Sequence, residues 1–129
     1  MEKKILIIED DVDMCDVLTE AFEDEGYSVC HFQNGLSGKK ELEEKSYDFL
    51  LLDIKIPDMN GFDILQWLKN KQKKIKIIVL TGMPLNEELT KYLHTDKSRE
   101  AELLQYADAV LNKPVKLNIL IDTLKNLDS

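Results

Sequence analysis

The sequence has no long hydrophobic run and few cysteines, and each absence excludes a class of protein. After residues 1–4, only four apolar residues, at 5–8, come before the acids Glu9 and Asp10, and a signal peptide needs a longer apolar region. No later run approaches the length that crosses a membrane, so no membrane association is expected. The two cysteines, Cys15 and Cys30, are not at a metal-binding spacing. They favour reduced thiols in a cytoplasmic protein.

An excess of positive charge is also missing. The chain has 17 Lys and Arg against 25 Asp and Glu, a net charge of −8. Because nucleic acids and anionic membranes bind basic faces, neither is expected as a partner of this segment. Hydrophobic residues make up 43% of the 129 positions, which is ordinary for one folded domain and argues against disorder. We expect a single domain over residues 1–129, with no internal repeat, linker or output domain.

Short apolar runs alternate with amphipathic segments along the chain. The runs at 5–8, 49–52 and 77–80 are continuous, which is typical of strands buried on both faces of a parallel sheet. Weaker strand candidates lie at 29–32 and 109–111. The pattern therefore predicts five strands, each followed by a helical segment.

The helical segments are recognised by apolar residues at helical spacing. They include 14–22, 62–68 and 117–124, and a weaker segment over 36–45 that Gly38 interrupts. Gly26 is placed to end the first helix. Five strand–helix pairs predict an α/β fold, a three-layer doubly wound sandwich around a parallel sheet.

Polar side chains follow the predicted strands at the point where each strand ends. They are Glu9-Asp10-Asp11, Asp53, Thr81 and Lys113-Pro114. In open parallel sheets, ligands bind beyond these carboxyl ends. Three carboxylates in one crevice repel one another, and Mg²⁺, which binds through a few protein oxygens and waters, would compensate their charge. With a hydroxyl and a lysine to bind phosphoryl oxygens, the set is typical of a phosphoryl-transfer site.

Each of these residues also has an ordinary structural explanation. Asp10 and Asp11 are suited to cap the following helix, Asp53 to begin a turn and Thr81 to close one. A lone lysine is usually a solvated surface residue. The functional interpretation depends on their shared position, since all of them fall at the matching end of successive core strands.

The chain resembles the receiver domain of two-component response regulators. The resemblance rests on four stretches that span nearly the whole chain in order, residues 5–11, 51–61, 79–82 and 112–114. It implies a flavodoxin-like receiver fold with the strand order 2-1-3-4-5. It also implies a cytoplasmic, phosphorylation-dependent signalling switch, and no enzyme that turns over an external substrate.

The resemblance assigns a role to each acid of the site. It implies that Asp53 is the phosphoacceptor, supplied by the phosphohistidine of a sensor histidine kinase or a histidine phosphotransfer protein. Asp53 and Asp10 are expected to bind Mg²⁺, with Glu9 acting through water and Lys55 through its backbone carbonyl. Asp11 is expected to cap the helix that follows it.

Thr81 and Lys113 are expected by the same resemblance to bind phosphoryl oxygens, and the peptide before Pro114 is expected to be cis. Phosphorylation would then change a surface that binds a downstream protein target.

Two departures from the family pattern bear on that switch. An aromatic residue is usual where Val110 stands, and Tyr106 aligns with a glycine of the family and does not replace it. The connection from Thr81 to Lys113 covers 32 positions (113 − 81), about ten more than usual. A helix start at 86–88 and a second helical piece over 99–106 are expected there. The extra length is either a tolerated surface insertion or a dedicated partner surface.

Two other functions compete with the switch. A docking module that works without phosphorylation is suggested by Val110 and the longer connection, although the intact acids, Thr81 and Lys113 speak against it. A haloacid-dehalogenase-like phosphatase also uses an aspartate nucleophile, but it needs a second acid two positions later, where this chain has Lys55.

Overall fold

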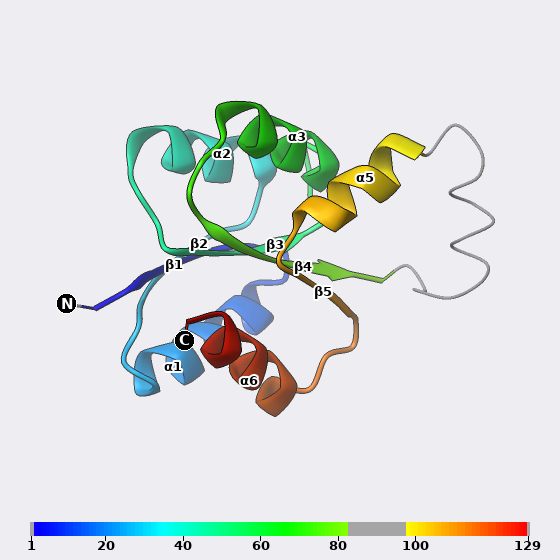
Figure 1. Ribbon diagram of the computed structural model, residues 1–129. Helices are drawn as coiled ribbons and strands as arrows, with labels where there is room; N and C mark the ends of the chain where they lie inside the picture. Colours follow the sequence, from blue (N-terminus) through cyan, green and yellow to red (C-terminus); the bar gives the residue numbers. More distant parts are fainter. Residues whose placement is uncertain (1, 83–97, 129) are drawn as a thin grey trace.

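The structure is a computed structural model, which describes residues 2–82 and 98–128. Strands and helices alternate along these residues (Figure 1). In chain order they are β1 (Lys4–Ile8), α1 (Val12–Asp24), β2 (Ser28–Phe32), α2 (Gly35–Glu44), β3 (Phe49–Asp53), α3 (Gly61–Lys71), β4 (Lys76–Thr81), α5 (Ser98–Tyr106), β5 (Ala109–Asn112) and α6 (Leu117–Asp128). All five predicted strands are confirmed within a residue or so of their expected ends.

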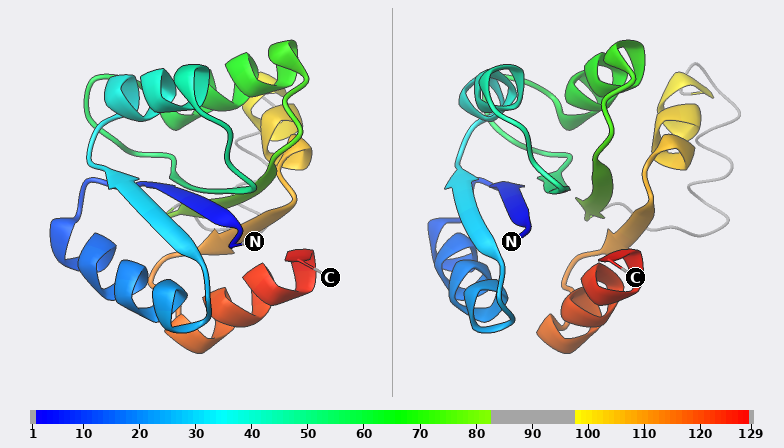
Figure 2. Two further views of the ribbon diagram at one scale, coloured as in Figure 1. Left: turned by 90° about the vertical axis from the view of Figure 1, so that its left-hand side faces the viewer. Right: turned by 60° about the vertical axis from the view of Figure 1, so that its left-hand side comes forward.

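The five strands form one parallel sheet in the order β2-β1-β3-β4-β5, which confirms the order that the resemblance implies. Helices α2, α3 and α5 cover one face, and α1 and α6 cover the other (Figures 1 and 2). The result is the expected three-layer sandwich. Because all strands run the same way, their carboxyl ends share one edge of the sheet, called here the carboxyl edge.

The core consists of two apolar layers, one on each face of the sheet. Along β1 and β3, alternate side chains enter opposite layers, as Leu6 and Ile7 illustrate. Both faces are covered, so successive residues must all be apolar. This explains the continuous runs in the sequence, whose residues in β1 and β3 are at most 2% exposed from Ile5 to Ile8 and from Phe49 to Leu52.

Helix α1 begins and ends as its sequence predicts. The Asp11 side chain accepts a hydrogen bond from the Met14 backbone N–H at 3.1 Å, which confirms Asp11 as the N-cap. At the other end Gly26 has a φ of 96°, the left-handed conformation that commonly follows a helix.

Gly38, which weakened the prediction of α2, has a packing role. A Cβ added there would lie 2.4 Å from Cδ1 and 2.7 Å from Cγ1 of Ile8, so a larger residue would fit only if the Ile8 side chain shifted. The glycine lets α2 pack directly on the end of β1, where the Glu9-Asp10-Asp11 stretch begins. Packing therefore outweighs the low helix propensity of glycine.

The segment before β5 is described only in part. The helix start predicted at 86–88 lies outside the described residues, whereas α5 confirms the second helical piece. Helix α5 packs on α3 through the buried Leu103, an Arg99–Asp63 ion pair of 3.2 Å, and a hydrogen bond of 3.4 Å from the Tyr106 hydroxyl to the Leu68 carbonyl. Within residues 2–82 and 98–128, every helix is too short or too polar to cross a bilayer.

Candidate functional site

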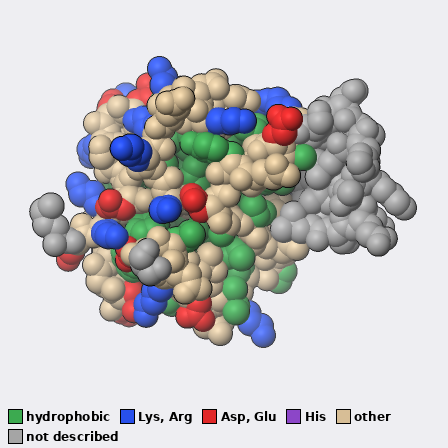
Figure 3. Space-filling view, viewed as in Figure 1, with side chains coloured by type: hydrophobic (Ala, Val, Ile, Leu, Met, Phe, Trp, Pro, Cys, Tyr) green, Lys and Arg blue, Asp and Glu red, His purple; other side chains and the backbone are tan. Residues whose placement is uncertain are grey.

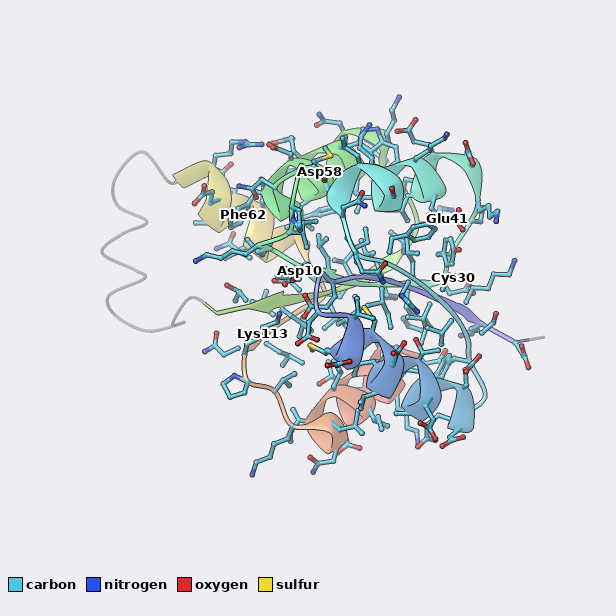
Figure 4. All side chains as sticks on the ribbon, turned by 180° about the vertical axis from the view of Figure 1, so that it is seen from behind. Asp10, Cys30, Glu41, Asp58, Phe62 and Lys113 are labelled. Carbon is cyan, nitrogen blue, oxygen red and sulfur yellow. The ribbon has the colours of Figure 1, made fainter. Side chains whose placement is uncertain are left out.

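The polar residues predicted to form a site come together at the carboxyl edge of the sheet. Glu9 and Asp10 follow β1, Asp53 ends β3, Thr81 ends β4 and Lys113 follows β5. Strand register aligns them, since Asp53 pairs with Leu80 just before Thr81. Figure 4 labels Asp10 and Lys113, which both lie at this edge.

The three acids form one cluster. One carboxylate oxygen from each of Glu9, Asp10 and Asp53 lies within 4.8 Å of the others. Glu9 is 1% exposed and Asp53 is 4% exposed, while Asp10 is open to solvent. Two buried carboxylates at this separation repel each other more strongly than they would in water. The cluster therefore requires compensating positive charge.

Lys113 supplies part of that charge. Its Nζ donates to Oε1 of Glu9 at 2.5 Å and to Oδ2 of Asp53 at 2.9 Å, so one amine bridges both buried acids. Partial burial lowers the pKa of Lys113, but the hydrogen bonds to the two carboxylates outweigh burial and leave that pKa raised. The lysine is thus held protonated. The Lys113–Pro114 peptide is cis, as expected.

The negative charge of the Glu9 carboxylate is only partly compensated by Lys113. Its Oε2 is buried and has no hydrogen-bond partner among residues 2–82 and 98–128. Burial, together with the neighbouring Asp53 carboxyl, raises the pKa of Glu9 to about 8, although Lys113 lowers it. A spare buried carboxylate oxygen beside two further carboxylates is a suitable donor set for a hard cation such as Mg²⁺. The residues present therefore fit a magnesium ion.

Lys55 takes part in the site through its backbone. Its N–H donates to Oδ1 of Asp53 at 3.2 Å, so both oxygens of Asp53 accept hydrogen bonds. Its side chain is exposed, and Lys55 lines a hollow together with Asp10 and Phe62. Metal binding by the Lys55 carbonyl stays a prediction.

Gly61 places the loop after β3 directly behind Asp53. A Cβ at this position would lie 2.7 Å from Cα of Ile54 and 2.9 Å from the carbonyl oxygen of Asp53. The Gly61 N–H also donates to the Ile54 carbonyl at 3.0 Å. Only glycine allows α3 to begin this close to the end of β3, and the contact fixes the backbone that carries Asp53.

Asp58 is a structural contributor that the sequence analysis missed. Its Oδ1 accepts from the N–H groups of Gly35 and Leu36, at 2.9 and 3.1 Å, at the start of α2. Its own φ is 64°, a conformation that Asp tolerates better than most residues. The sequence indicates a loop at 57–61, but nothing in it identifies α2 as the partner.

Comparisons with known proteins identify the family of the chain. Residues 5–125 match the family described as the response regulator receiver domain. The response regulator receiver protein CpdR of Brucella abortus is 34% identical over 128 residues, which cover 97% of this chain and 96% of that protein. Several longer transcriptional regulatory proteins match over 90 residues, and the chain spans 40% of their length.

Solved structures show the same fold. A CheY-like receiver domain protein from Methanospirillum hungatei superimposes with a TM-score of 0.82 at 28% identity, covering 98% of this chain and 94% of that one. The response regulator TrrA of Thermotoga maritima, solved in complex with Mg²⁺ and BeF, has a TM-score of 0.77 at 26% identity, with 97% and 98% covered. With the family match extending from β1 into α6, this chain belongs to the response regulator receiver family of two-component signalling systems.

Proposed function

We propose that the chain is a phosphorylation-dependent signalling switch in which Asp53 accepts a phosphoryl group from a phosphohistidine. The observation that carries this proposal is the Lys113 amine, which hydrogen-bonds both Asp53 and Glu9 inside the acid cluster. A buried carboxylate held between a fixed cation and a backbone amide is oriented for attack.

In the proposed reaction, an oxygen of Asp53 forms a bond to phosphorus as the bond from phosphorus to the donor imidazole nitrogen breaks. The imidazole keeps the electron pair of that bond. Lys113, already protonated and close to Asp53, stabilises negative charge on the phosphoryl oxygens, and the Thr81 hydroxyl at the end of β4 binds another of them.

The acids of the cluster are proposed to hold Mg²⁺, through Asp10, Asp53, Glu9 and the backbone carbonyl of Lys55. When bound, the ion neutralises charge on the transferred group. The buried Oε2 of Glu9, which has no hydrogen-bond partner among the described residues, supports this assignment, because a buried carboxylate oxygen without a partner is destabilising.

The proposed partners are a sensor histidine kinase or histidine phosphotransfer protein, and a downstream protein whose binding surface changes on phosphorylation. The proposed location is the cytoplasm, in line with two free cysteines, Cys15 and Cys30. A domain of this kind modifies only itself and is not an enzyme in the usual sense. We propose it as one receiver domain over residues 1–129.

A docking module that works without phosphorylation is the competing function, because Val110 replaces the usual aromatic residue and lies partly buried against the α3–α5 side of the core. In that case the acid cluster would be retained only for folding. The two functions differ in whether Asp53 is modified.

The test is incubation with Mg²⁺ and acetyl phosphate, followed by mass spectrometry of the intact protein and its peptides. We expect added phosphoryl mass on Asp53, loss of it in Asp53→Asn, and its retention in Asp48→Asn, which changes an acid at the opposite edge of the sheet. A folded protein that gains no phosphoryl mass would support the docking module and refute the switch.

A further inference from the structure

The end of the sheet opposite the phosphorylation site is strongly basic. Five of the eight residues from 69 to 76 are lysines and none is acidic, whereas residues 5–38 contain nine acids and no Lys or Arg. The basic run covers the end of α3 and the start of β4, where the strands begin. We call residues 69–76 and Lys45 the basic edge. Charge is therefore segregated within an acidic protein.

The basic edge is hollowed on both sides of the same short segment. Lys73, Lys74 and Ile75 line two hollows, of about 190 and 320 Å³. The smaller also includes Leu42, Lys45, Ser46 and Tyr47, and the larger includes Asp48, Lys76 and Asp108. Apolar groups thus lie between the lysines, which gives the surface places for uncharged side chains as well as anions.

Four of these lysines have no acidic salt-bridge partner in the described part of the chain. Lys69, Lys71, Lys74 and Lys76 are exposed and form no salt bridge with any residue in the described part of the chain. Figure 3 shows Lys and Arg side chains on the left of the molecule, around the start of the sheet, with Asp and Glu side chains among them.

The two acids that line the larger hollow accept hydrogen bonds from backbone N–H groups. Asp48 accepts from the Lys4 N–H at 2.8 Å, and Asp108 accepts from the Ile77 N–H at 2.7 Å. Lys73 is the fixed member of the set: its Nζ donates to the Leu42 carbonyl at 2.8 Å and lies 5.4 Å from the centre of the Trp67 ring. Lys45 is also engaged, since its Nζ lies 3.5 Å from Oε2 of Glu41, so two of the six lysines have partners and the other four are available.

From this arrangement we propose that the basic edge binds a short acidic segment of a partner protein, with apolar residues between its carboxylates. A long polyanion such as a nucleic acid fits poorly, because the net charge of −8 repels it outside this one edge. A short segment can lie on the exposed lysines and the smaller hollow, whose lining residues include no acid. The site is far along the strands from Asp53 and is independent of phosphoryl transfer.

The test uses a fluorescently labelled short peptide of alternating Glu and Leu, with binding followed by anisotropy. We expect the double variant Lys71→Gln/Lys74→Gln to bind this peptide about fivefold more weakly than the unmodified chain. The matched control, Lys116→Gln/Lys125→Gln, loses the same charge elsewhere and should stay within about twofold. Thermal unfolding of both variants checks that they are folded.

Several results would overturn the proposal. These are no binding by the unmodified chain, equal weakening in the two double variants, or tighter binding of an oligonucleotide of equal charge than of the peptide. Self-association of the chain that the Lys71→Gln/Lys74→Gln variant loses would also overturn it, because the occupant would then be a second copy.

Discussion

At the carboxyl edge of the sheet three acids converge within 4.8 Å of one another, two of them buried, whereas at the opposite edge lysines stand exposed. The two buried acids at the first edge, Glu9 and Asp53, share one cationic partner, Lys113. At the second edge four of the lysines, at 69, 71, 74 and 76, form no salt bridge with any described residue. Both edges concentrate charge of one sign, but only the first places it inside the protein.

The two edges differ because burial changes how much a charged side chain contributes to stability. An exposed charge is screened by water and salt, and its loss changes stability little. A buried charge needs a partner in the right place, so removing that partner lowers the free energy of unfolding strongly. The carboxyl edge should therefore respond sharply to single substitutions, and the basic edge weakly.

The largest effect is expected from removing the lysine of the acid cluster. In Mg²⁺-free buffer, Lys113→Ala should lower the free energy of unfolding by about 3 kcal/mol, because Glu9 and Asp53 lose their shared cation. Lys74→Ala at the basic edge should change it by less than about 0.5 kcal/mol. Urea denaturation measures both, and equal effects would remove the distinction between the two edges.

The next effect concerns the backbone behind Asp53. Gly61→Ala should destabilise the protein by about 2 kcal/mol, because the added methyl group collides with backbone atoms that cannot move aside. Gly82→Ala is the control at the same edge, where an added Cβ meets no atom of residues 2–82 and 98–128 within 4 Å. If the two variants unfolded at the same urea concentration, the close contact at Gly61 would be unimportant.

The free energy of unfolding is also expected to depend on pH through Glu9. The folded-state pKa of Glu9 is raised from 4.5 to about 8, so the folded protein binds this proton more tightly than the unfolded chain. The stabilisation is complete below about pH 4.5 and is lost as the pH rises towards about 8, with a slope of at most about 1.4 kcal/mol per pH unit. Urea titrations across this range in Mg²⁺-free buffer measure the slope. Glu9→Gln should flatten it, and an unchanged slope would show that another group is responsible.

The smallest effect is expected at the loop that joins the site to α2. Asp58→Ala removes the acceptor for two amides of α2 and should destabilise by about 1 kcal/mol. Asp58→Asn keeps an acceptor oxygen and tolerates the positive φ, so it should lose less. Thermal unfolding distinguishes the two, and a larger loss in Asp58→Asn would argue against the capping role.

Much of this arrangement follows from sequence because its causes are local. Continuous apolar runs identify β1, β3 and β4, whose side chains are buried on both faces of the sheet. Once strands are parallel, the residue after each strand must reach the same edge. That rule brings Glu9, Asp53 and Lys113 together without any knowledge of their contacts.

The features that sequence did not yield depend on contacts between distant segments. Nothing local shows that Asp58 caps α2, since its partners are 22 and 23 positions away. Gly38 weakens a helix by local propensity, and only its contact with Ile8 explains it. The lysines of the basic edge are visible in the sequence, but their hollows are formed with residues of α2 and the turn before β3.

Magnesium binding by the acid cluster is tested most directly by the thermal unfolding midpoint as a function of Mg²⁺ concentration, compared between the unmodified chain and Asp10→Asn. A cation that relieves the crowded acids binds the folded state alone, so the midpoint of the unmodified chain should rise steadily with Mg²⁺. Asp10→Asn should respond much less. An unmodified chain whose midpoint ignores Mg²⁺, or rises no more than that of Asp10→Asn, would contradict the account.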